Sequence, residues 1–237
     1  MTEPLVLIPG MMCDGRVFLD QITAFGADRA VQIASCGKHQ SISLMAKHVL
    51  ESAPAKFALA GHQMGGVVAM EVLRMAPDRV MRLAVMSCTP LAETPQEAAA
   101  RETRIMQARA GHFDDVVRGE VPVSALAPGA GRMAVQASLT EMLTAQGGAV
   151  FLAQSRAMQR RPDQQRLLRQ LRGIPVMVLC GAHDTITPPR RHQFMAELTP
   201  HASLSVIETA GHVPPLESPK AVTTAMRQWL AAPYVLN

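Results

Sequence analysis

The ten residues Phe-Ala-Leu-Ala-Gly-His-Gln-Met-Gly-Gly, at positions 57–66, organise the rest of the chain. A short apolar run at 57–60 predicts a buried strand, and it ends at Gly61. The apolar run at 64–76 predicts a helix that is apolar on nearly all sides and therefore deeply packed. The stretch is thus expected to form a strand, a tight turn and a helix, with glycines on both sides of one outward-pointing residue.

The turn within this stretch matches four of the five positions of the G-x-S-x-G nucleophile elbow. Gly61, His62, Met64 and Gly65 fit the pattern, but Gln63 stands where the serine belongs. A carboxamide has no proton that ionises near neutral pH and little nucleophilicity, so a histidine cannot activate it as it activates a hydroxyl. The sequence therefore predicts the backbone of a nucleophile site without its usual nucleophile.

The overall composition indicates a globular protein. Of the 237 residues, 48% are hydrophobic and 18% are charged, and no apolar run is long enough to span a bilayer. The N-terminal residues lack a basic leader and an extended apolar stretch, so we expect no signal peptide and a cytoplasmic location. The four cysteines fit reduced thiols better than a disulfide framework, and their spacing matches no zinc pattern.

The charge of the chain gives a weaker indication of its partners. The net charge is +4, but aromatic residues make up only 3% and no basic stripe is present, so we expect no nucleic-acid partner. Between residues 90 and 172, 11 arginines and no lysines face 8 acidic residues, an excess of 11 − 8 = 3 positive charges. A solvated helical surface would explain this excess. The alternative is a small-molecule substrate that is anionic.

Strand and helix patterns alternate along most of the chain, which predicts an α/β fold with a parallel sheet and right-handed crossovers. From about 95 to 171 no strand is expected, only helices broken by prolines and a glycine pair. We interpret this part as a helical insertion. The expected strands are 5–8, 31–34, 57–60, 83–86, 176–180 and 204–207, and the expected helices are 16–24, 41–51, 64–76, 96–110, 131–146, 149–160, 163–171, 190–198 and 218–230.

Reactive side chains are expected in the loops that follow these strands. Ligands bind at the carboxyl ends of the strands in an open parallel sheet. The loop after 176–180 contains Asp184, and the loop after 204–207 contains His212. Their order along the chain, elbow, then acid, then histidine, is the order in which α/β-hydrolases present nucleophile, acid and base.

With these motifs in place, the chain resembles an α/β-hydrolase of the small esterase and acyl-hydrolase kind over nearly its whole length. The matching motifs are Leu-Ile-Pro-Gly-Met at 7–11, the elbow at 61–66, Gly-Ala-His-Asp at 181–184 and Gly-His at 211–212. The resemblance implies that Asp184 orients and charges His212, which acts as the base. It implies that the backbone N–H groups of Met11 and Met64 form the oxyanion hole.

The same resemblance implies an α/β-hydrolase fold with a mostly parallel sheet of about six strands that lacks the first hairpin. The core would comprise 1–89 and 173–237, and 90–172 would form a helical cap that shapes the substrate pocket. The His-Gly pair usual before the oxyanion loop is replaced by Pro9-Gly10, a variation that should be tolerated. No metal and no organic cofactor is implied, and the sequence assigns no oligomeric state.

Gln63 leaves three functions open. The first is an enzyme that acts on a small carbonyl or ester-like substrate, with His212 and Asp184 as the general base and no acyl-enzyme. The second is a serine esterase whose nucleophile has been replaced, natively or by design, and the third is a ligand-binding relative without catalysis. In each case Gln63 could hydrogen-bond His212, a water or a substrate carbonyl, because its amide offers two donors and an acceptor.

Each candidate residue also has a simpler explanation. Asp184 could merely cap the turn that follows it, and His212 could be an ordinary loop residue. We expect His62 to pack structurally. Cys13, close to the oxyanion loop, could replace the serine as nucleophile, although a small buried thiol is the usual case.

Overall fold

The computed structural model describes residues 2–234, and its six strands form one sheet in the order β2-β1-β3-β4-β5-β6. Every neighbouring pair of these strands is parallel, which confirms the expected α/β-hydrolase fold class. The strands are β1 (Leu5–Ile8), β2 (Val31–Ile33), β3 (Phe57–His62), β4 (Val80–Met86), β5 (Val176–Gly181) and β6 (Ser203–Ile207).

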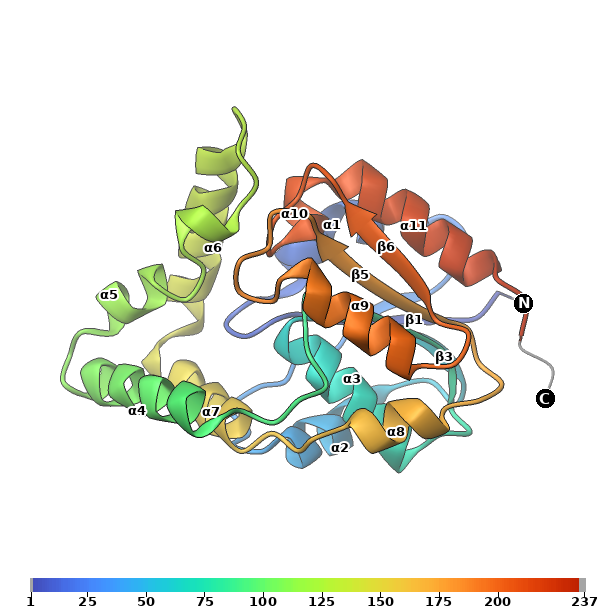
Figure 1. Ribbon diagram of the computed structural model, residues 1–237, viewed down its shortest axis with the longest axis horizontal. Helices are drawn as coiled ribbons and strands as arrows, with labels where there is room; N and C mark the ends of the chain where they lie inside the picture. The colour runs from blue at the N-terminus through green and yellow to red at the C-terminus, as the bar shows by residue number, and fades with distance from the viewer. Residues whose placement is uncertain (1, 235–237) are drawn as a thin grey trace.

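Helices cover both faces of the sheet (Figure 1). The helices α1 and α11 lie together on one face, and α2, α3, α8 and α9 lie on the other. Their bounds are α1 (Leu19–Gly26), α2 (Ile42–Ser52), α3 (Met64–Met75), α8 (Gln165–Gln170), α9 (Pro189–Leu198), α10 (Pro214–Glu217) and α11 (Pro219–Ala231), with a 3-10 turn η1 (Gly15–Phe18) before α1.

The central strands are buried on both faces, as their continuous apolar sequences predict. Every residue of β1, β3 and β5 is buried, which is typical of parallel strands between two helical layers. In the register of the sheet, Ile8 pairs with Gly61 and His62 pairs with Met86. The loops that leave β1, β3 and β4 therefore begin side by side at one edge.

Between β4 and β5 the chain is helical, and most of this part projects beyond the carboxyl ends of the strands (Figure 1). We call residues 90–172 the helical segment. Its first helix begins with a capping box, in which Thr94 and Glu97 bond each other's backbone N–H groups. Its elements are α4 (Pro95–Arg109), α5 (Phe113–Arg118), the 3-10 turn η2 (Val123–Ala125), α6 (Arg132–Gln146), α7 (Gly148–Gln159) and α8.

The structure differs from the sequence expectations in short elements. The helix expected over 16–24 is a 3-10 turn followed by α1, because the Asp14 side chain accepts a hydrogen bond from the Arg16 N–H group and starts a tighter turn. Both α5 and α10 fall in stretches that were expected to be loops. Each is a single turn or little more, and tertiary contacts rather than periodicity determine elements of this length.

Candidate active site

The elbow has the strained backbone that its sequence predicts. Gln63, between β3 and α3, has φ 51° and ψ −118°, in the region that side-chain-bearing residues seldom occupy. The flanking glycines permit this close turn. A Cβ atom on Gly65 would lie 2.1 Å from the carbonyl oxygen of Ile8, and one on Gly61 would lie 2.2 Å from that of Gly65. The turn therefore presents residue 63 outward, as in a nucleophile elbow.

The side chain of Gln63 occupies the place expected to receive a substrate oxygen. The Met11 N–H group donates a hydrogen bond of 2.9 Å to Gln63 Oε1. Because a backbone N–H group can only donate, this contact fixes which end of the amide is the oxygen. The oxyanion hole expected from Met11 and Met64 thus stays a prediction, and in this structure Gln63 Oε1 takes the place of a substrate oxygen at the Met11 N–H group. Met64 is the first residue of α3, where backbone N–H groups have no partner within the helix.

Asp184 and His212 meet as expected. His212 Nδ1 lies 2.9 and 3.0 Å from the two carboxylate oxygens of Asp184, and both side chains are fully buried. Burial alone would raise the pKa of Asp184, but hydrogen bonds from His212 and Thr187 outweigh it and hold this pKa below its usual value. Asp184 also accepts N–H bonds from Ile186 and Thr187, so it caps the following turn while it orients the histidine.

The other ring nitrogen of His212 is left as a base. Asp184 is ionised and can only accept, so Nδ1 of His212 donates and Nε2 has a free lone pair. Within residues 2–234 this Nε2 atom has no hydrogen-bond partner. His212 lines the same pocket as Gln63. A proton acceptor therefore faces the pocket opposite an amide rather than a hydroxyl.

Two side chains hold the loop of His212 in place. His62 lies buried beneath it, and its Nε2–H group donates to the His212 carbonyl oxygen at 2.9 Å, which supports the structural role expected for His62. The carboxylate of Glu217 accepts N–H bonds of 2.9 Å from Gly211, 2.8 Å from Val213 and 2.7 Å from Ala127 of the helical segment. His62 and Glu217 therefore hold the loop of His212 in place, and Glu217 also joins it to the helical segment.

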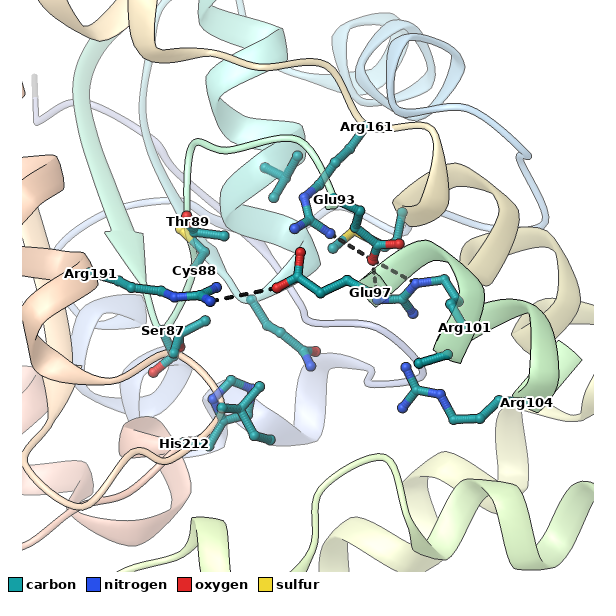
Figure 2. Close-up of a pocket in the computed structure, with 16 residues that line it drawn as sticks. Ser87, Cys88, Thr89, Glu93, Glu97, Arg101, Arg104, Arg161, Arg191 and His212 are labelled. Atoms are coloured by element: carbon teal, nitrogen blue, oxygen red, sulfur yellow. Dashed lines mark hydrogen bonds and ion pairs between the residues drawn. The ribbon is translucent and has the colours of Figure 1, made fainter. Parts of the chain in front are cut away.

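The pocket beside these residues has a volume of about 240 Å³. Figure 2 shows His212 on one side of it and a set of charged side chains from the helical segment on the other. Apolar surface comes from residues such as Val67 and Met158. The lining residues are Gln63, Val67, Ser87, Cys88, Thr89, Glu93, Glu97, Ala100, Arg101, Arg104, Met158, Arg161, Ile186, Thr187, Arg191 and His212.

Comparison with known proteins agrees with this fold. The model of the alpha/beta hydrolase family matches residues 5–225. The chain belongs to the alpha/beta hydrolase family. Its relatives include enzymes named as esterases, lipases and lactonases.

Individual relatives of this alpha/beta hydrolase are distant in sequence. It is 26% identical to the sn-1-specific diacylglycerol lipase ABHD11 of Mus musculus, over 73% of this chain and 58% of the mouse protein. It is 24% identical to the pimeloyl-[acyl-carrier protein] methyl ester esterase of Nitrosomonas europaea, over 76% of this chain and 73% of that protein. The structure of a thermophilic esterase from Thermogutta terrifontis with malate bound superposes with a TM-score of 0.85 at 25% identity, over 97% of this chain and 90% of that one.

Within residues 2–234 of this alpha/beta hydrolase, no hydroxyl or thiol is hydrogen-bonded to His212 Nε2 as a substitute nucleophile would be. Cys13 lines a different pocket, on the other side of the oxyanion loop, and burial raises the pKa of its thiol to about 12. Ser87, which sequence reasoning missed, lines the pocket with φ 48°, a strained value. Its hydroxyl, like His212 Nε2, lacks a hydrogen-bond partner within the described residues, so the two atoms do not form a nucleophile–base pair.

Sequence reasoning also missed a stripe of pocket residues on α4. Glu97, Ala100, Arg101 and Arg104 all line the pocket and are spaced i, i+3, i+4 and i+7. This spacing puts them on one face of the helix. The pattern was visible in the sequence, but polar residues at helical spacing ordinarily indicate a solvated face. Only the position of α4 over the sheet edge shows that this face lines the pocket.

Two buried neutral histidines should make the stability of this hydrolase fall in mild acid. Burial lowers the pKa of both His62 and His192 to about 4. The unfolded chain binds these protons near pH 6.5, so between pH 6.5 and 4 it holds more protons than the folded chain. The free energy of unfolding is therefore expected to decrease as the pH falls through this range, by about 3 kcal/mol per histidine.

Urea unfolding at pH 7.5, 6 and 5 measures this effect. His192→Gln should reduce the loss of stability between pH 7.5 and 5, whereas His112→Gln, which removes a histidine whose side chain is 67% exposed, serves as the control. Equal pH dependence in the native protein and the His192→Gln variant would contradict the assignment of His192 as a buried neutral group.

Proposed function

We propose that this chain is an enzyme in which His212, oriented by Asp184, acts as a general base on a small carbonyl or ester-like substrate without forming an acyl-enzyme. The observation that supports this most directly is the intact Asp184–His212 pair, whose free Nε2 atom borders the pocket. A protein that used this pocket only for binding would gain nothing from a buried, oriented imidazole of this kind. Gln63 provides no group that could be acylated.

Gln63 has a positive role in this proposal. Its oxygen is held by the Met11 N–H group, so the amide NH₂ group is the part left to contact a ligand in the pocket. The NH₂ group of Gln63 thus replaces the Met11 N–H group as the hydrogen-bond donor, at a position further into the pocket. A substrate carbonyl oxygen would accept from this NH₂ group, and the donor would stabilise the negative charge that develops during reaction.

The reaction that fits these groups is attack by water. His212 Nε2 removes a proton from the water while its oxygen bonds to the substrate carbonyl carbon, and the carbonyl oxygen gains negative charge against the Gln63 amide. Collapse of this intermediate breaks the bond to the leaving oxygen, which takes the proton back from His212. The products are a carboxylic acid and an alcohol. A proton on carbon beside a carbonyl could be removed by the same base.

We further propose that the helical segment is a cap that selects the substrate. Seven of the sixteen pocket residues, Glu93 among them, belong to the helical segment. Two more, Cys88 and Thr89, lie just before it in the chain. The Thermogutta terrifontis esterase, to which the chain is similar, has malate bound, and small carboxylic acid derivatives are compatible with the arginines of this pocket. The substrate proposed is therefore a small molecule that carries negative charge.

One observation favours a second candidate, a serine esterase whose nucleophile has been replaced. The Met11 N–H group is occupied by the side chain at residue 63, so a carbonyl in the usual position would first have to displace Gln63. In that case the present protein would bind esters without turning them over. Retention of the complete acid–base pair beside Gln63 is equally expected for both candidates, so turnover decides between them.

The test compares the native protein with His212→Ala and His183→Ala on a panel of small esters, lactones and thioesters. We expect the native protein to turn over at least one class, and His212→Ala to lower kcat/KM by about 10²- to 10⁴-fold. His183 is exposed and adjacent to Asp184, so His183→Ala is the matched control and should retain activity. Turnover by a folded His212→Ala variant at the native rate would refute the proposal.

A further inference from the structure

The wall of the pocket opposite His212 has more positive than negative charge. Four arginines line the pocket, against two glutamates, Glu93 and Glu97, so the lining has an excess of 4 − 2 = 2 positive charges. Figure 2 shows Glu93 between Arg161 and Arg101, and Glu97 turned toward Arg191. A group of charges with this excess favours an anion in the space that it borders.

Glu93 cannot neutralise both of its partners. Its carboxylate oxygen lies 2.5 Å from Arg101 and 2.8 Å from Arg161. The side chains of Glu93, Arg101 and Arg161 are 2%, 12% and 6% exposed, so water does little to screen the remaining positive charge. Taken by themselves, these three side chains therefore carry one net positive charge in a nearly dry wall of the pocket.

Arg104 adds a second cation on the same face of α4. It lies three residues after Arg101, which makes the two side chains neighbours on the helix. Its Nη1 atom lies 3.2 Å from Glu120 Oε1, and no other ion pair of Arg104 is found within the described residues. Burial raises the pKa of Glu120, although Arg104 opposes this effect, and the single contact leaves most of the five guanidinium N–H donors of Arg104 unused. The N–H donors of Arg104 are thus available to a ligand.

This pair of arginines lies next to the reacting groups. Arg101 Nη1 lies 3.7 Å from Met11 Sδ, and the Met11 N–H group holds the side chain of Gln63. A ligand whose carbonyl meets Gln63 and His212 therefore has Arg101 close to that carbonyl, and Arg104 lines the same pocket next to Arg101 on α4.

We propose that Arg101 and Arg104 bind a carboxylate of the substrate, so that the substrate is a small carbonyl or ester compound with a free carboxylate a few atoms from the reacting carbonyl. This deepens the proposed function and rests on it for the position of the reacting carbonyl. The pocket volume of about 240 Å³ fits a compound somewhat larger than benzene, which fills an apolar cavity of about 150 Å³. Long acyl chains exceed this space.

The test measures binding, so that it does not depend on turnover. Calorimetry compares monomethyl succinate, which has one carboxylate, with dimethyl succinate, which is neutral and nearly the same shape. The native protein is expected to bind the monoester at least about tenfold more tightly, because a charge-assisted hydrogen bond from arginine has about this effect. The preference should weaken as salt is raised.

Arg104→Met removes the charge and nearly keeps the length of the side chain, and it should reduce the preference severalfold, because only Arg101 of the pair remains. Arg109→Met is the matched control, because Arg109 is exposed on the same helix and does not line the pocket. Arg104→Lys should keep part of the preference. If Arg104→Met does not fold, the partial loss expected for Arg104→Lys tests the position, and the salt dependence of the native protein tests the charge.

The outcomes separate this inference from the proposed function. If the native protein prefers the monoester and Arg104→Met does so severalfold less, the carboxylate site stands, even where neither compound is hydrolysed and the proposed reaction fails. If the native protein binds dimethyl succinate equally well, or if Arg104→Met keeps the full preference, the carboxylate site is wrong, whatever the turnover.

Discussion

Replacing Gln63 by serine is expected to raise the hydrolysis of activated short-chain esters by on the order of 10³-fold or more. The reason is that every other part of a serine hydrolase site is already in place. The elbow backbone has the required strained conformation, and the Asp184–His212 pair leaves Nε2 free beside the pocket. Removal of the glutamine also frees the Met11 N–H group for the substrate oxygen.

Gln63→Ala is the matched control for this prediction. It frees the Met11 N–H group but adds no hydroxyl, so it should show no increase over the native rate with activated esters and should not react with a fluorophosphonate probe. Gln63→Ser should be labelled by the probe at position 63, as mass spectrometry of the digested protein can verify. A well-folded Gln63→Ser protein that neither hydrolyses esters nor reacts with the probe would mean that His212 is not placed to activate residue 63.

The second large effect is expected for Asp184→Asn in the Gln63→Ser background, where kcat should fall by about 10⁴-fold. An asparagine would present either an NH₂ group or a single carbonyl oxygen to His212 Nδ1. The first choice forces the proton onto Nε2, and the imidazole can then no longer accept a proton from the hydroxyl. The second choice removes the negative charge that stabilises the protonated imidazole.

Kinetics with 4-nitrophenyl acetate measure this loss, and Asp163→Asn in the same background is the control, because Asp163 is exposed in the helical segment. The unfolding midpoint of both variants must be determined alongside, since Asp184 also accepts two backbone N–H bonds that asparagine can only partly replace. A loss of less than about tenfold in a stable Asp184→Asn variant would show that Asp184 caps its turn without a part in catalysis.

Those parts of the fold that depend on local sequence were predictable. The strand at Leu5–Ile8 and the helix after the elbow follow from apolar runs ended by proline and glycine, and the structure places both where expected. The meeting of Asp184 with His212 was predictable as well, because parallel strands bring their carboxyl ends to one edge and the order of the loops matched a known arrangement.

The contact between Gln63 and Met11 was not predictable from the sequence. An amide can accept or donate at either end, and only the tertiary approach of the oxyanion loop decides that the oxygen of Gln63 faces the Met11 N–H group. The charged wall on α4 was hidden for a related reason. The excess of arginine in the helical segment was evident, but the sequence did not say that Arg101 and Arg104 face the pocket while Arg109 faces water.

The carboxylate of Glu217 joins Ala127 to Gly211 and Val213, and the His212 N–H group donates to the Ala125 carbonyl oxygen at 2.8 Å. Because of these bonds, a displacement of residues 125–127 away from the sheet would also displace the imidazole of His212. A movement of the helical segment that leaves His212 in place must therefore occur outside residues 125–127, for example at α4 and α5. Such a movement would widen the pocket for a ligand without displacing the imidazole of His212.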